Sequence, residues 1–172
     1  VEIYVGRNNW NKAPIEYIDP FLVKEKDTIE LQKDNVYVES LDGNIEIEPY
    51  IVPDIRSFPE EQREKFSSYY SWNEMQGIYI FRNKRLLSYS KWHNLKYKNQ
   101  TIKEKSEKYR NLRIKISFNN LKYLENLDLT INKTKMSLPI EVSEKLSLKL
   151  DYIIEEYFRH SSIGKIKKVF VY

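Results

Sequence analysis

Two short stretches of the chain place cations close enough together to bind a phosphate. The first is the connection Asn132-Lys133-Thr134-Lys135, which lies between an alternating apolar segment and Pro139, where a helical pattern starts. A junction of this kind sets lysine ammonium groups beside backbone N–H groups, and both attract phosphate oxygens. From the local pattern alone, an ordinary polar connection is the simpler explanation.

The second stretch is the tip of a predicted β-hairpin, where Arg82, Lys84 and Arg85 lie close together. Asn83 tolerates a positive φ, so we expect a tight turn at Asn83-Lys84. With 14 Tyr and the polar stretch 96–108, this basic tip suggests nucleic acid as a partner. Charged tips are commonly just solvated, however, and 29 basic residues face 25 acidic ones, for a net charge of +4.

The residues of several common catalytic sites are absent or badly spaced. The chain has no cysteine, which excludes disulfides, thiolate zinc sites and a cysteine nucleophile. His93 and His160 are far apart and lack metal-ligand spacing, so each is most simply structural. Neither a GxSxG motif nor a glycine-rich phosphate loop occurs. The sequence therefore predicts no metal site and no complete active site, and no apolar run reaches the ~20 residues that span a bilayer.

The elements that would position the cations are mostly strands. Asp42-Gly43 predicts a turn, whereas Pro49 and Pro53 argue against a central strand in the stretch that contains them. Trp72 is most simply a core aromatic that anchors the hairpin after it. Alternating apolar and polar residues predict strands at 1–5, 28–31, 36–39, 113–118 and 124–131.

Helices are expected in two places, with a polar region between them. The first is the stretch 59–70, and the last begins at Pro139, carries apolar residues at helical spacing and ends at Gly164. Residues 96–108 are expected to form a solvated loop or a short helix. Because strands dominate and helices interrupt them, the predicted fold class is α+β.

Several strings of the sequence, taken in order, resemble a bacterial family of GHKL ATPases (the gyrase, heat-shock chaperone, histidine kinase and MutL group) akin to the microrchidia proteins. Their order and spacing match over most of the chain. The strings are DPFL at 19–22, PYIVP at 49–53, WNEMQGIYIFRNKRLL at 72–87, KWHNL at 91–95, NLRIKISFNNL at 111–121 and LDLTINKTKMSLP at 127–139.

The resemblance implies a single transducer-like domain over residues 1–172, with a β-rich first segment at 1–53 and the hairpin, strands and final helix at 72–164. Its fold would resemble a ribosomal-protein domain, with a mixed or mostly antiparallel sheet and helices packed on one face. Since Val1 opens directly into an alternating pattern, we expect a fragment whose upstream part binds ATP and Mg²⁺. The fragment alone is expected to bind neither and to be inactive.

The resemblance also implies a role for the first stretch of cations. Lys133 would act as the catalytic lysine that contacts the γ-phosphate of ATP held by the upstream domain, with Asn132 and Lys135 as flanking nucleotide contacts. The family often has two lysines where this chain has Asn132-Lys133. The whole protein would be a cytoplasmic ATPase that closes as a homodimer, with DNA as a further partner.

Two alternatives to the transducer hypothesis stay open. One is a basic nucleic-acid-binding module without ATP chemistry, which would use Arg82, Lys84 and Arg85. The other is a scaffold that only dimerises, for which exposed edge strands would be the evidence.

Overall fold

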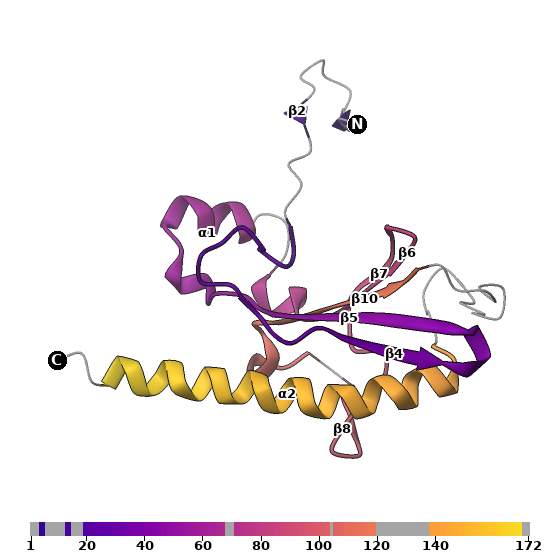
Figure 1. Cartoon of the computed structure of the whole chain (residues 1–172). Helices are drawn as coiled ribbons and strands as arrows, with labels where there is room; N and C mark the ends of the chain where they lie inside the picture. The colour runs from indigo at the N-terminus through magenta and orange to yellow at the C-terminus, as the bar shows by residue number, and fades with distance from the viewer. Residues whose placement is uncertain are drawn as a thin grey trace.

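A mixed six-stranded sheet forms the centre of the fold (Figure 1), in the order β3-β5-β10-β6-β7, with β4 also paired to β5. The computed structural model describes residues 4–5, 13–14, 19–67, 71–103, 105–119 and 138–169, and only the backbone at 4–5, 13–14 and 162–169. β10 and β6 run parallel, and the other pairs in this sheet are antiparallel. The strands are β3 Ile29–Glu30, β4 Asp34–Val38, β5 Gly43–Ile51, β6 Gly77–Arg82, β7 Arg85–Lys91 and β10 Leu112–Phe118.

Two helices and several short elements complete the described part of the chain. The helix α2, Ile140–Val169, runs along one side of the sheet, and the short helix α1, Glu60–Ser67, lies on the other side (Figure 1). The α+β fold class predicted from the sequence is confirmed. The short elements are the strand pairs β1 Tyr4–Val5 with β2 Ala13–Pro14 and β8 Lys96–Tyr97 with β9 Gln100–Thr101, and the 3-10 turns η1 Glu39–Leu41, η2 Ile55–Ser57, η3 Trp72–Met75 and η4 Glu107–Tyr109.

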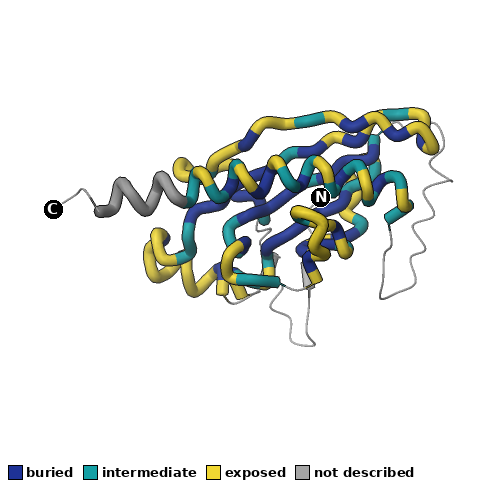
Figure 2. Tube along the Cα trace, turned by 90° about the horizontal axis from the view of Figure 1, so that it is seen from below, coloured by how far each residue is buried: buried dark blue, intermediate teal, exposed yellow. Residues whose placement is uncertain are grey.

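The main core lies between the sheet and α2. Along β10, every second residue from Leu112 to Phe118 is buried in this core, because side chains alternate between the two faces of a strand. Figure 2 shows buried and exposed residues alternating along α2, as expected for a helix with one apolar side. The helix residues in this core are Val142, Leu146, Leu150, Ile153, Ile154 and Tyr157.

The proline in β5 makes one sequence expectation wrong. Pro49 lies inside a strand that is paired on both sides, opposite Ile114 of β10. Its carbonyl oxygen accepts a hydrogen bond from the backbone N–H of Leu31, 3.0 Å away, in the chain that joins β3 to β4. The N and the C=O of one strand residue point to the same side, so the N–H that proline lacks falls at the break between β3 and β4. There it interrupts no ladder.

The last helix is longer than the sequence suggests. It was expected to end at Gly164, but α2 continues as far as Val169. A glycine inside a helix costs only about 1 kcal/mol relative to alanine, and it ends a helix only where the backbone turns left-handed. Residues 165–169 therefore belong to the helix.

The stretch 96–108 is also different from its prediction as a solvated loop or short helix. Its first part is the β8–β9 hairpin, which is tied to α2 by hydrogen bonds from backbone N–H groups to helix side chains. The N–H of Lys96 donates to Ser147 Oγ at 3.1 Å, and that of Lys98 to Asp151 Oδ1 at 2.6 Å. The local sequence could not reveal these contacts, because the partner side chains lie on a helix much later in the chain.

The backbone conformation at Gly77, at the start of β6, should favour glycine over any other residue. Its φ is +106°, and a Cβ built there would lie 3.2 Å from the carbonyl oxygen of Lys91. Gly77→Ala should therefore lower the free energy of unfolding by about 2 kcal/mol. Urea unfolding followed by circular dichroism measures this, with Gly43→Ala as the control, because Gly43 has no positive φ. Equal losses in the two variants would contradict the prediction.

Candidate functional site at the hairpin end of the sheet

The turn between β6 and β7 forms where the sequence predicts it. Asn83 and Lys84 have φ values of +46° and +68°, both left-handed, as a two-residue type I′ turn requires. Arg82 and Arg85 pair across the strands on either side of the turn. Arg82 is half-buried, whereas Lys84 and Arg85 are exposed. The hairpin tip, which we define as residues 82–85, therefore presents three cations at the end of the sheet.

This tip lies beside the end of β10. The backbone N–H of Asn83 donates to the carbonyl oxygen of Phe118 at 3.3 Å. Because β6 and β10 are parallel, their carboxyl ends fall at the same edge of the sheet. On the other side of β10, Phe118 pairs with Ile45 near the start of β5. The last described residue after β10, Asn119, donates its side-chain N–H to Glu46 Oε2 at 3.3 Å.

The start of α2 lies at the same end of the sheet. The carboxylate of Glu141 accepts hydrogen bonds from the backbone N–H groups of Glu39, at 2.8 Å, and Ser40, at 3.1 Å. Both belong to the η1 turn, which joins β4 to β5. Leu138 and Asn119, the described residues that flank the segment 120–137, are thus both at the end of the sheet that carries the hairpin tip.

The predicted nucleotide contacts themselves lie outside the described residues. Asn132, Lys133 and Lys135 all fall in the segment 120–137, as does the strand predicted at 124–131. The role of Lys133 therefore stays a prediction. The sequence-predicted cations that can be placed are those of the tip, and none of the three forms an ion pair with a carboxylate of the described residues. Other cations do form such pairs, at 2.9 Å for Lys33 with Glu48 and 2.5 Å for Lys149 with Asp34.

At the end of the β6–β7 hairpin away from the tip, a buried amide network connects the residues around Gln76. The sequence did not suggest this network. The side chain of Gln76 is fully buried. Its Oε1 accepts from Trp92 Nε1 at 3.3 Å and from the backbone N–H of Ser106 at 3.1 Å. Its Nε2 donates to the carbonyl oxygens of Asn73, at 2.9 Å, and Ser106, at 3.1 Å. An amide can satisfy donors and acceptors together without carrying charge, so this network is structural.

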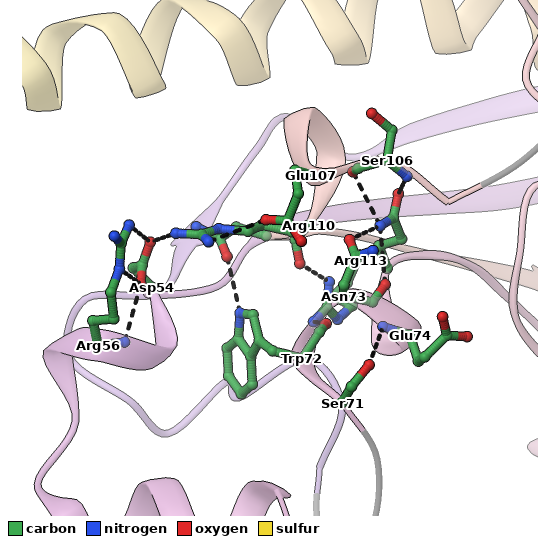
Figure 3. Close-up of polar contacts among 12 residues, drawn as sticks. Asp54, Arg56, Ser71, Trp72, Asn73, Glu74, Ser106, Glu107, Arg110 and Arg113 are labelled. Atoms are coloured by element: carbon green, nitrogen blue, oxygen red, sulfur yellow. Dashed lines mark hydrogen bonds and ion pairs between the residues drawn. The ribbon is translucent and has the colours of Figure 1, made fainter.

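Arg113 of β10 is a second buried polar group, on the face opposite α2 (Figure 3). Its Nη1 donates to the carbonyl oxygens of Arg110, at 2.7 Å, and Leu112, at 3.2 Å, and its Nη2 donates to that of Trp72, at 3.3 Å. The guanidinium carbon lies 5.5 Å from the Trp72 ring centroid. Burial lowers the pKa of Arg113 to about 10. Because its hydrogen bonds go to backbone carbonyls and it is sealed from solvent, Arg113 is a structural residue.

Trp72 is buried, which confirms that it is a core aromatic. Its ring packs against Phe58 and Phe66, with centroids 6.0 and 5.5 Å away, and its Nε1 donates to Asn111 Oδ1 at 2.9 Å (Figure 3). Its contacts therefore reach α1 and the residue before β10, so that it joins the short helix to the sheet.

A surface ion pair cluster lies next to Arg113. The carboxylate of Asp54 accepts from Arg56 Nε at 2.9 Å and also binds Arg110 (Figure 3). The hydrogen bonds from Arg56, with Arg110 nearby, hold the pKa of Asp54 well below its usual range. All three side chains have partners, so this cluster does not present an open binding site.

The described residues offer little support for other kinds of site. Within the described ranges, no group of three histidine, cysteine, aspartate or glutamate residues could hold a metal ion. In the same part of the chain, no helix is long and apolar enough to cross a membrane. Comparisons of the chain with protein-family models, curated proteins and solved structures found no match.

Proposed function

We propose that this chain is the transducer-like module of a GHKL-type ATPase, and that Lys133 contacts the γ-phosphate of ATP held by a separate ATP-binding domain. The observation that carries the proposal is the placement of both flanks of the segment 120–137. Asn119 and Leu138 lie at the end of the sheet that also carries the three cations of the hairpin tip. A phosphate recruited there would meet several positive charges.

The mechanism we propose is that of a nucleotide sensor. An ammonium group beside the γ-phosphate makes a charge-assisted contact that is lost after hydrolysis and phosphate release. The segment that carries Lys133 lies between β10 and α2 in the chain, and these two elements form much of the main core. A change in that contact would therefore act on the orientation of the whole module, because only a differential contact shifts a conformational equilibrium. We place this ATPase in the cytoplasm and expect its ATP-binding domains to close as a dimer.

Replacing the lysine tests the proposal. In the full-length polypeptide, Lys133→Ala should lower ATP turnover on the order of 100-fold, the usual effect of removing one donor to a transition-state oxygen. Lys135→Ala is the matched control and should have a smaller effect. Steady-state phosphate release measures both, and circular dichroism checks that the variants fold. Equal or reversed effects would show that Lys133 is not the contact.

The isolated chain provides the second arm of that experiment. Under the proposal, residues 1–172 alone hydrolyse no ATP, since Mg²⁺ and adenine are bound by the other domain. Robust hydrolysis by this chain alone would overturn the transducer assignment. A partner domain with a magnesium-binding asparagine and a glycine-rich lid would support the same assignment.

A nucleic-acid-binding module is the second candidate function. It is favoured by the three cations of the hairpin tip, which have no carboxylate partner among the described residues. Binding of this kind weakens steeply with salt, since each phosphate contact releases counterions. The two candidates are compatible, because an ATPase can also act on DNA.

A further inference from the structure

A second basic surface lies well away from the hairpin tip, between the β8–β9 hairpin and η4. It is a cleft of about 380 Å³. We name it the lysine cleft after three of its lining residues, Lys98, Lys103 and Lys108. Its apolar part is formed by Tyr97, Ile102 and Tyr109.

The apolar part of the lysine cleft is held in place before any ligand arrives. Ile102 and Tyr109 are buried, with 8% and 2% of their surfaces exposed. The Tyr109 ring packs against Trp92 at 5.3 Å and against Phe158 of α2 at 5.9 Å, measured between ring centroids. A ligand that lies on this surface therefore does not have to order the side chains beneath it, which favours binding.

The three lysines differ in how far their charge is already neutralised. Lys98 Nζ lies 2.6 Å from Glu155 Oε1, so much of its charge is compensated. Lys108 Nζ lies 4.6 Å from the centroid of the Tyr109 ring, a contact that leaves its positive charge in place. Lys103 is exposed. Neither Lys103 nor Lys108 pairs with a carboxylate of the described residues, and no such carboxylate lines the cleft.

A second cleft, which is also lined by residues of this hairpin, has a different character. It measures about 430 Å³ and is lined by Glu144, Asp151 and Lys96, with the exposed apolar side chains of Ile140 and Leu148. Two carboxylates face one lysine there, so this cleft suits an anion less well than the lysine cleft does.

We propose that the lysine cleft binds a nucleotide, either free or as one unit of a single-stranded nucleic acid. The phosphate would lie on Lys103 and Lys108, and the base would lie on the half-buried ring of Tyr97, with Ile102 and Tyr109 packed beneath. Gln100 and Thr101, which also line the cleft, supply polar side chains at its edge. A combination of unpaired ammonium groups with a fixed aromatic surface suits a nucleotide better than inorganic phosphate, because phosphate alone would leave the aromatic surface exposed to water.

Fluorescence anisotropy with a labelled oligothymidylate of about 15 nucleotides tests this proposal at about 50 mM salt. The double variant Lys103→Glu/Lys108→Glu should weaken binding at least 10-fold and reduce the slope of log K against log salt by about 2, since roughly one unit is lost for each phosphate contact. Lys24→Glu/Lys26→Glu is the matched control. It makes the same change in net charge at exposed lysines in the loop after Phe21, and should change binding less than about threefold.

A second arm separates the two sources of the nucleotide. AMP is titrated while the amide NMR signals of Ile102, Lys103 and Tyr109 are followed. Shifts that saturate with AMP and disappear in the double variant identify a free nucleotide as sufficient, whereas shifts with the oligonucleotide alone identify a single strand. The absence of binding to either probe would overturn the proposal. So would an equal loss in the control variant, or a loss confined to Lys84→Glu/Arg85→Glu, which would assign binding to the hairpin tip.

The lysine cleft stands independently of the transducer assignment. Its test uses nucleotide binding by this chain and leaves Lys133 unchanged. A failed ATPase experiment would therefore not affect it, and its own failure would leave the sensor mechanism intact.

Discussion

Gln76→Ala should lower the free energy of unfolding by roughly 3–5 kcal/mol, because each buried polar group that loses its partner costs about 1–3 kcal/mol. The substitution removes the acceptor of Trp92 Nε1–H and of the Ser106 N–H, and also the donor to the carbonyl oxygens of Asn73 and Ser106. These groups come from η3, the segment before η4 and the segment after β7. Their loss should therefore loosen all three connections at once.

Urea unfolding followed by circular dichroism measures the loss at Gln76. Gln100→Ala is the matched control, since Gln100 is exposed on β9 and a surface substitution of this kind usually changes stability by less than about 0.5 kcal/mol. If Gln76→Ala unfolds at the same urea concentration as Gln100→Ala, the amide network does not stabilise the fold.

Arg113→Ala should destabilise the chain by roughly 3–4 kcal/mol, whereas Arg113→Met should cost about 1 kcal/mol or less. Alanine leaves a cavity beside Trp72 in place of a fully buried side chain, and core truncations of this size cost about 2–5 kcal/mol. Methionine fills most of that space. It also removes a cation that is buried without a carboxylate partner among the described residues, a situation in which an apolar replacement is often neutral or stabilising.

The comparison of the two Arg113 variants is more informative than either alone. Exposed Arg63 of α1 gives the control, because Arg63→Ala should change the unfolding free energy by less than about 0.5 kcal/mol. Thermal and urea unfolding both apply. A loss with methionine as large as that with alanine would mean that the hydrogen bonds to the backbone carbonyls of Arg110 and Trp72 outweigh the cost of burying the charge.

Some features of the site could be predicted because they depend on neighbours in the chain. A tight turn at Asn83-Lys84 follows from residues that tolerate positive φ between two alternating strands. In the same way, the spacing of Val142, Leu146 and Leu150 identified the side of α2 that is buried. Both patterns act over a few residues, so the sequence contains all that is needed.

The effect of the proline in β5 could not be predicted from its neighbours in the chain. Pro49 was expected to exclude a central strand, but the missing N–H faces a gap between two other strands. Whether a proline interrupts a ladder depends on which segments lie beside it, and those are set by pairing between distant parts of the chain.

Pairing between distant segments also explains why two residues with similar positions in the sequence pattern differ in burial. The alternation of RIKISF placed Arg113 and Lys115 together on the polar side of a strand. In the fold, Arg113 is sealed beneath Trp72, whereas Lys115 binds Glu48 at 2.5 Å and remains partly exposed. Covering elements on that face, absent from the local pattern, decide between the two outcomes.

The local conformations of this protein, namely its alternating strands, its I′ turn and the apolar side of its last helix, were determined by the sequence itself, because they arise from interactions among near neighbours. Only the tertiary structure decided which cations are available to a ligand. Lys103, Lys105 and Lys108 look alike in sequence, yet Lys105 Nζ binds Glu74 Oε2 at 2.9 Å and Ser90 Oγ at 3.1 Å, while the other two line the lysine cleft. A charge is neutralised by whatever the fold brings within a few ångströms, and those partners come from remote segments of the chain.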